Sequence, residues 1–411
     1  MFGRWTIGQS RLMDLSFISR VLPRKPSTNP LGLRGSYADP IRNIDWILLS
    51  AVIAQVIIGL FTVFSATRQR LIDQHLDVFV YVQRQVFFII VASAVIAVVM
   101  SLGHDWIRAQ SGFLYGGILL LLAMVLGAGA VTGGARLAFD LGSISLQPAE
   151  LAKPVLLVLV ASYLSESIPD RIDWHHFVMT LYIVLIPCGL ILMQPDLGSA
   201  SVILAGAAGV LYVGNARRRY LALIGGMFVG TALGLMAAIE SLGYQGGRFL
   251  AWFSQIDWFS QFFNIKTSEN IVLQVRYAKR AVSTGGFFGK GYLQGPLTNG
   301  KYVPVQFTDF PFSAIGEQFG MLGGAVVLGL FGVILWRIWR TAQMARDRFS
   351  FFLASGAFTM VMFQIFQNIG MTLGVVPVSG LPLPFISYGG SHLISSAILI
   401  GLVQSIHMRR L

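Results

Sequence analysis

Asp309 is the residue whose surroundings first suggest chemistry. It lies in the stretch FTDFPFS (307–313), one carboxylate among three phenylalanines and a proline. A charged group in such apolar surroundings is costly unless it is paired or has a function. A carboxylate in this position could take a proton from a hydroxyl group as a general base. The alternative is that Asp309 only caps a helix that begins at Pro311.

A second pair of ionisable residues lies in the otherwise apolar stretch LQPAELAK (146–153). Glu150 and Lys153 are three residues apart, so a helix places them on one face, where they can pair. Ionisable residues inside a membrane usually face one another or a cavity, and they often mark a functional site. The sequence leaves two readings open: the pair contributes to a ligand site, or it only holds helices together.

Prolines begin four of the segments that we expect to enter the membrane from one side. Proline suits the first helical turn, where its missing N–H costs nothing. Asp196 would then lie in a first turn, where a carboxylate complements the helix dipole, although capping alone also explains it. Helix N-termini near basic residues favour a phosphate or pyrophosphate site, but transporters of organic anions use the same arrangement. The four prolines are Pro148, Pro195, Pro311 and Pro384.

The composition is that of a membrane protein. Of the 411 residues, 55% are hydrophobic and 12% are charged, about half the charge of a typical soluble domain. Several stretches of about 20 residues carry almost no charge, which is the length that crosses a bilayer as a helix. We therefore expect an all-α polytopic membrane protein. The ten expected spans lie near 45–65, 85–103, 112–131, 148–164, 177–193, 196–213, 219–239, 311–335, 350–374 and 385–407.

The distribution of basic residues predicts the orientation. Ten spans place both termini on one side, and with the termini in the cytosol the cytosolic segments carry 18 of the 30 lysines and arginines. The short outer segments carry four, and the long loop 240–310 does not count under the positive-inside rule. The sequence thus predicts a cytosolic tail over 1–44, a single transmembrane domain over 45–411, and 240–310 as a large extracytoplasmic loop between the seventh and eighth spans.

One segment of the long loop has a helical pattern. In SENIVLQVRYAKRAV (268–282) the apolar residues fall on one face, and Arg276, Lys279 and Arg280 lie elsewhere. This pattern predicts a helix in the membrane interface. Its basic residues could bind lipid headgroups or an anionic substrate, and the sequence does not decide between them.

Several other functions find no support in the sequence. The stretch TGGFFGKGY (284–292) departs from a phosphate-binding P-loop at two positions, so its glycines more plainly indicate a tight turn or a close backbone approach. A single cysteine excludes an intramolecular disulfide. The basic residues are explained by membrane anchoring, so we expect no nucleic-acid partner.

Taken together, six motifs resemble the SEDS (shape, elongation, division and sporulation) family over about residues 41–411. The resemblance implies a glycosyltransferase of the bacterial cytoplasmic membrane, working with a class B penicillin-binding protein, a transpeptidase. Its substrate would be lipid II, an undecaprenyl-pyrophosphate disaccharide-pentapeptide, joined into β-1,4 glycan outside the membrane. The last motif is more similar to the elongation type than to the division type. The motifs are LQPAELAK (146–153), LMQPDLGSA (192–200), GYQGGR (243–248), STGGFFGKG (283–291), FTDFPFSAIGEQFG (307–320) and NIGMTLGVVPVSGLPLPFISYGGS (368–391).

The resemblance also implies roles for residues. Asp309 matches the family's essential catalytic aspartate, and Glu150 and Lys153 match a pair that borders the same cavity. The family permits Mg²⁺ or Mn²⁺, for which Asp309, Glu150 and Glu317 are the candidate ligands. The other residues expected at the pyrophosphate or in the cavity are Arg136, Asp196, Arg248, Gln274, Arg276, Lys279, Glu317 and Ser387.

This chain departs from the family next to the aspartate. Members commonly read PExHTDFIF, whereas this chain reads PVQFTDFPF, so Val305 and Phe307 replace an acid and a histidine. The replacement puts in doubt any auxiliary role of those two positions and any metal site there.

Two other functions remain open at this stage. A lipid II flippase would also need many spans and intramembrane charges, and a non-enzymatic scaffold would recruit the transpeptidase. The flippase is less favoured because Asp309 and the large loop are both expected outside, while the cytosolic loops are short and basic.

Overall fold

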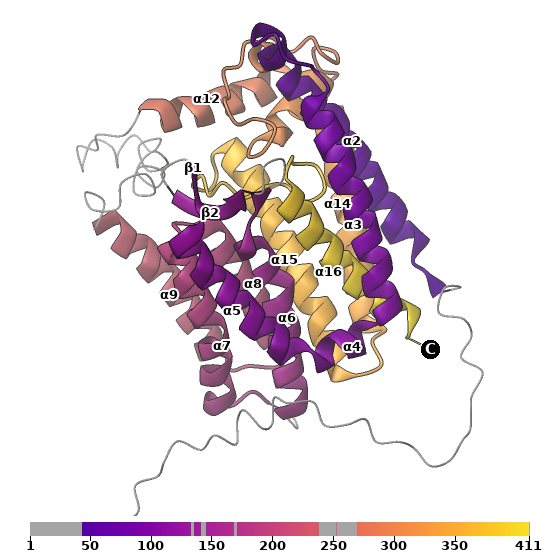
Figure 1. Ribbon diagram of the computed structural model, residues 1–411, viewed down its shortest axis with the longest axis vertical. Coiled ribbons are helices and arrows are strands. Elements are labelled where there is room, and N and C mark those ends of the chain that lie inside the picture. The colour runs from indigo at the N-terminus through magenta and orange to yellow at the C-terminus, as the bar shows by residue number, and fades with distance from the viewer. Residues whose placement is uncertain are drawn as a thin grey trace, which may run out of the picture.

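The protein is a bundle of long helices (Figure 1). The computed structural model describes residues 43–132, 135–140, 145–167, 171–237, 252 and 269–410, so the predicted tail 1–44 lies almost wholly outside the described residues. The described helices are α2 (Trp46–Asp73), α3 (Val80–Leu102), α4 (His104–Ala109), α5 (Ser111–Ala128), α6 (Pro148–Ser167), α7 (Trp174–Met193), α8 (Leu197–Val213), α9 (Arg218–Ala237), α12 (Glu269–Thr284), α13 (Pro296–Asn299), α14 (Pro311–Gln343), α15 (Arg348–Leu373) and α16 (Gly390–Met408).

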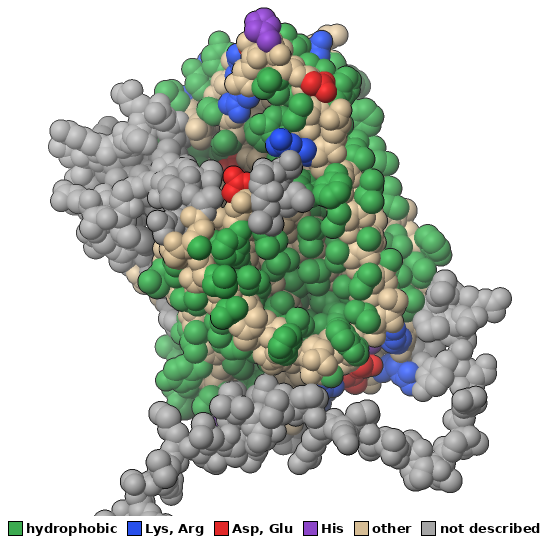
Figure 2. All heavy atoms as spheres, viewed as in Figure 1, with side chains coloured by type: hydrophobic (Ala, Val, Ile, Leu, Met, Phe, Trp, Pro, Cys, Tyr) green, Lys and Arg blue, Asp and Glu red, His purple; other side chains and the backbone are tan. Residues whose placement is uncertain are grey.

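The helices confirm a multi-pass membrane protein. Within the described residues, eight helices are long and apolar enough to cross a bilayer. The shorter apolar helix α8 and the helix α9 lie at the other two predicted spans. On the face shown in Figure 2, hydrophobic side chains cover the middle of the molecule, and charged side chains gather toward its two ends.

Three short strands were not predicted. β1 (Ala130–Thr132), β2 (Ala135–Asp140) and β3 (Ser145–Leu146) form antiparallel pairs in the order β1-β2-β3 between α5 and α6. They lie toward the upper end of the molecule in Figure 1, the end that also carries α12, whereas α4 and the C-terminus lie at the lower end.

The proline pattern is correct at two helices and wrong at two. Pro148 and Pro311 begin α6 and α14, as predicted. Pro195 precedes Asp196, which is the N-cap of α8. Pro384 begins no helix, because α16 starts at Gly390 after a loop in which Gly380, Phe385 and Gly389 all have positive φ.

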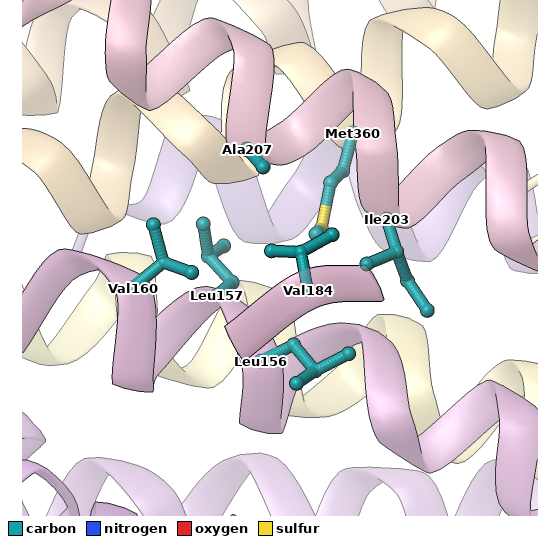
Figure 3. A pocket seen from close by; sticks show the side chains of 7 residues that line it. All are labelled: Leu156, Leu157, Val160, Val184, Ile203, Ala207 and Met360. Atoms are coloured by element: carbon teal, nitrogen blue, oxygen red, sulfur yellow. The ribbon is translucent and has the colours of Figure 1, made fainter. Parts of the chain in front are cut away.

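Of the eight candidate spans among the described helices, α6 and α16 are the most buried. In α6 and α16, 78% and 89% of the spanning residues are buried, compared with 22% in α3. Figure 3 shows where α6, α7, α8 and α15 meet: seven apolar side chains, among them Leu157 and Met360, point toward one another. The space between them is too small for water, so this part of the interior is packing and not a ligand cavity.

The predicted amphipathic helix is present as α12. Val275 and Ala278 on its apolar face are buried with Val303 and Phe310 in a small hydrophobic cluster. The apolar face therefore packs against protein, and the location of this helix in the membrane interface stays a prediction.

The glycine-rich segment 285–291 packs against a break in α14. Gly320 has φ 63° and ψ −158° inside that helix, so the helical hydrogen bonding is interrupted there. The freed carbonyls of Glu317 and Gln318 accept hydrogen bonds from the N–H groups of Lys290 and Gly291, at 2.9 and 3.0 Å. The glycines thus allow a close backbone approach, which is one of the two roles predicted from the sequence. Among the described residues, the backbone that they approach is that of α14.

A glycine of α2 makes a second close approach, which gives a stability prediction. A Cβ added at Gly59 would lie 2.7 Å from the Cα and carbonyl oxygen of Ile386. We expect Gly59→Ala to destabilise the protein by about 1–3 kcal/mol, since backbone would have to move. Thermal unfolding of the detergent-purified protein measures the effect.

The matched control is Gly329→Ala in α14, where an added Cβ meets nothing within 4 Å. Alanine has the higher helix propensity, so this variant should be unchanged or slightly more stable. Equal stability of the two variants would contradict the close packing of α2 on the loop.

Candidate functional site

Asp309 lies in a tight turn immediately before α14. Its side chain is partly exposed, and its N–H donates to the carbonyl oxygen of Val305 at 3.0 Å. The N-cap residue of α14 is Phe310, whose side chain makes no capping hydrogen bond. The structure therefore does not support the alternative in which Asp309 is the N-cap of this helix.

Two segments remote in sequence hold the backbone of this turn. The Ser387 hydroxyl donates to the carbonyl oxygen of Thr308 at 2.6 Å, and the Tyr388 N–H donates to that of Phe307 at 3.0 Å. From α15, the side-chain amide of Asn368 donates to the carbonyl oxygen of Asp309 at 2.8 Å. Three consecutive carbonyls are thus fixed, which restricts the direction in which the Asp309 side chain can leave the backbone.

Aromatic rings pack beside the turn. The rings of Tyr81 (α3), Phe307 and Tyr388 contact one another, with centroids 5.2 to 5.7 Å apart. Burial raises the pKa of the Tyr388 hydroxyl. Phe307 packs here as an apolar side chain between two tyrosines.

Glu150 and Lys153 form the predicted pair, and a third residue joins them. Lys153 Nζ lies 2.6 Å from Glu150 Oε1, and Nδ1 of His392 in α16 lies 3.2 Å from Glu150 Oε2. The three side chains are 1–4% exposed, and the Ser395 hydroxyl donates to the main-chain oxygen of Glu150 at 2.7 Å. Sequence analysis missed His392, since only the packing of α16 on α6 brings it to Glu150.

The cluster and the Asp309 turn belong to connected segments. His392 lies in the first turn of α16, a few residues after Ser387 and Tyr388, which hold the turn. Ser391 also ties this region to the start of α6, because its hydroxyl accepts from the N–H of Gln147 at 3.0 Å. The first turns of α6 and α16 are therefore joined next to the loop that fixes Asp309.

Asp196 and Glu317 make contacts typical of structural acids. Asp196 accepts hydrogen bonds from the Ser199 N–H and from the Gln147 side chain. Glu317 is fully buried and accepts from the N–H of Leu297 and from the N–H and hydroxyl of Thr298, at 2.6–2.8 Å. Glu317 thus holds the short helix α13 against the start of α14.

The described residues offer no ligand set for a metal ion. Among them, no three histidine, cysteine, aspartate or glutamate side chains come close enough to hold one. Both oxygens of Glu150 and both of Glu317 are already used within the protein. The predicted Mg²⁺ or Mn²⁺ ion therefore stays a prediction.

The basic residues of the predicted site are described in part. On α12, Arg276 is exposed, whereas Gln274 and Lys279 are partly buried. Arg136 lies in β2, but its side chain is outside the described part of the structure, as is the whole of Arg248.

The chain is similar to proteins of one family along almost its whole length. A model of the family described as "Cell cycle protein", covering FtsW, RodA and SpoVE, matches residues 45–411. Stage V sporulation protein E of Bacillus subtilis is 31% identical over 365 residues, 88% of this chain and 96% of that protein. The probable peptidoglycan glycosyltransferase FtsW of Geobacter metallireducens is 30% identical over 373 residues, 90% of this chain and 96% of that protein.

Solved structures show the same fold. The crystal structure of the rod shape determining protein RodA of Thermus thermophilus superposes with a TM-score of 0.64 at 30% identity, covering 89% of this chain and 97% of that one. A chain from a peptidoglycan synthase complex that coordinates polymerization and crosslinking gives a TM-score of 0.73, also at 30% identity, covering 89% and 98%.

The contacts of Glu317 predict a structural effect. Glu317→Gln keeps the side-chain volume, but it replaces one acceptor oxygen by an N–H₂ group that faces donors. We expect a loss of about 1–3 kcal/mol in the free energy of unfolding, since buried donors lose their acceptor. Thermal unfolding in detergent measures it.

Glu166→Gln is the matched control, because the Glu166 side chain is 55% exposed and pairs with Arg108 near the surface. Its stability should change by less than about 0.5 kcal/mol. A Glu317→Gln variant as stable as this control would refute the structural role.

Proposed function

This chain belongs to the SEDS family, which includes FtsW, RodA and SpoVE, and we propose on that premise that it polymerises lipid II into β-1,4 glycan at the outer face of the bacterial cytoplasmic membrane. The observation that carries the proposal is the Asp309 turn, in which a partly exposed carboxylate follows a backbone fixed at three consecutive carbonyls. Such a rigid mounting suits a group that must meet a substrate in one geometry.

In the proposed reaction Asp309 is the general base. Its carboxylate takes the proton of the acceptor sugar's 4-hydroxyl while that oxygen attacks the anomeric carbon of the lipid-linked donor. The new C–O bond forms as the bond from the anomeric carbon to the pyrophosphate oxygen breaks. Undecaprenyl pyrophosphate leaves with the bonding electron pair, and the configuration inverts. One carboxylate is enough, because pyrophosphate leaves readily without a proton.

Cationic groups of the outer segments would stabilise the leaving pyrophosphate. Arg276 is the best placed of the described candidates, since it is exposed on α12, the helix packed on Phe310 next to Asp309. Lys153 is buried and bonded to Glu150, so its proposed role is to hold Glu150 in place and not to contact the pyrophosphate. A bound Mg²⁺ or Mn²⁺ ion would supply further positive charge to the pyrophosphate.

The proposed orientation places both termini in the cytosol. Its support is the excess of lysine and arginine in the short segments on that side. The Asp309 turn lies beside the start of α16, because Ser387 and Tyr388 just before that helix bind its carbonyls. The other end of α16 leads to the C-terminus, at the lower end of the molecule in Figure 1. A cytosolic C-terminus therefore requires an extracytoplasmic Asp309.

We further propose a role in cell elongation, with a class B penicillin-binding protein as the partner. The support is the stretch GMTLGVVPVSG (370–380), which is more similar to the elongation type, together with the likeness to RodA and to a chain of a peptidoglycan synthase complex. Complementation tests this role: the gene should restore rod shape to cells depleted of RodA and should not restore division to cells depleted of FtsW.

The proposed base is tested by Asp309→Asn. The amide keeps the size of the side chain but cannot accept a proton, so we expect polymerisation to fall at least ~100-fold. The assay incubates purified protein, alone and with its partner, with labelled lipid II and resolves glycan chains by gel electrophoresis. Asp173→Asn is the control, because this exposed aspartate caps α7 at the opposite end of the bundle from Asp309.

Polymer formation by a folded Asp309→Asn protein at the wild-type rate would refute the assignment. If wild-type protein with its partner made no polymer, the flippase or the scaffold would be favoured instead. Transport of labelled lipid II across vesicle membranes would then separate those two.

A further inference from the structure

His392 has no part in the proposed reaction, yet its environment is unusual. The ring is 4% exposed, its Nδ1 contacts Glu150, and its Nε2 has no hydrogen-bond partner within the described residues. A buried histidine with one nitrogen bound to a carboxylate and the other open has the arrangement by which acids orient histidines in enzyme sites.

The chemistry of the partners determines the position of the proton. A carboxylate only accepts hydrogen bonds, so Nδ1 must carry the hydrogen in its contact with Glu150 Oε2. Lys153 occupies the other oxygen, and the ammonium and carboxylate charges cancel. The two contacts thus join three side chains from α6 and α16 around one carboxylate.

We propose that His392, through its Nδ1 contact with Glu150, is a positioning residue for the candidate active site. The inference rests on the proposed polymerase function. With His392 on one oxygen and Lys153 on the other, the Glu150 carboxylate cannot rotate, and the first turns of α6 and α16 are fixed to each other.

The effect reaches Asp309 through the backbone. α16 begins at Gly390, directly after the segment in which Ser387 and Tyr388 hold the carbonyls of Thr308 and Phe307. A loose α16 N-terminus would let that segment move and would change the position of the Asp309 carboxylate. The His392 contact thus acts on turnover through geometry, without touching the substrate.

The tautomer is tested in the wild-type protein. Histidine labelled with ¹⁵N distinguishes protonated from unprotonated ring nitrogens by NMR, and subtracting the spectrum of His392→Asn isolates this residue. We expect a protonated Nδ1, because the carboxylate of Glu150 can only accept. An unprotonated Nδ1 could not donate to Glu150 and would overturn the proposal.

Activity is tested with two variants. In His392→Asn the side-chain amide can place an N–H where Nδ1 donates, so kcat should stay within about threefold of wild type. His392→Ala has no donor, and we expect kcat to fall roughly tenfold with little change in KM, because misplaced catalytic groups slow the reaction step. Ser395→Ala is the control, since it removes a hydrogen bond to the main chain of Glu150 and leaves the carboxylate contacts intact.

Wild-type kcat in His392→Ala, or equal losses in both histidine variants, would contradict the positioning role. If His392→Ala does not fold, the tautomer and the asparagine variant still decide. Polymerisation by wild-type protein and its loss in Asp309→Asn do not depend on His392, so failure of this proposal is distinguishable from failure of the proposed function.

Discussion

The candidate site depends on the hydrogen bonds that fix the backbone around Asp309. The carbonyls of Phe307, Thr308 and Asp309 each accept from a residue of the C-terminal third of the chain, at 2.6–3.0 Å. Contact with α14 itself adds to these hydrogen bonds, because the Gln306 side chain donates to the Ser313 hydroxyl at 3.0 Å. The geometry of the turn is nevertheless largely a tertiary property, made by α15 and by the loop that joins α15 to α16.

The surrounding structure supports this arrangement at several levels. Gly59 of α2 lies against the backbone of the loop between α15 and α16. The buried cluster of Glu150, Lys153 and His392 joins α6 to α16. Below the turn, Glu317 and the break at Gly320 tie the start of α14 to the segments that precede it. Such internal hydrogen bonds satisfy and fix backbone groups that belong to no helix or strand.

The features that were predicted correctly from the sequence are those that a pattern of neighbouring residues determines. Long apolar stretches gave the spans, the spacing of Glu150 and Lys153 gave their pairing, and the amphipathic pattern gave α12. The rest depends on residues brought together from far along the chain. His392 lies 242 positions from Glu150 in the sequence, and Asn368 lies 59 positions from Asp309. No pattern of neighbouring residues predicts contacts over such separations. The same limit explains why Pro384 was wrongly predicted to begin a helix. The conformation of the loop around it is determined by tertiary contacts and not by helix propensity.

The central claim is that the fixed turn positions the Asp309 carboxylate for proton transfer, and kcat of Ser387→Ala tests it most directly. This change removes the hydroxyl that donates to the carbonyl of Thr308 and accepts from the N–H of Leu383, while leaving Asp309 and every charged group in place. The account predicts a roughly tenfold or larger fall in kcat at a nearly unchanged KM for lipid II, in protein that remains folded. A kcat equal to that of the wild type would contradict it.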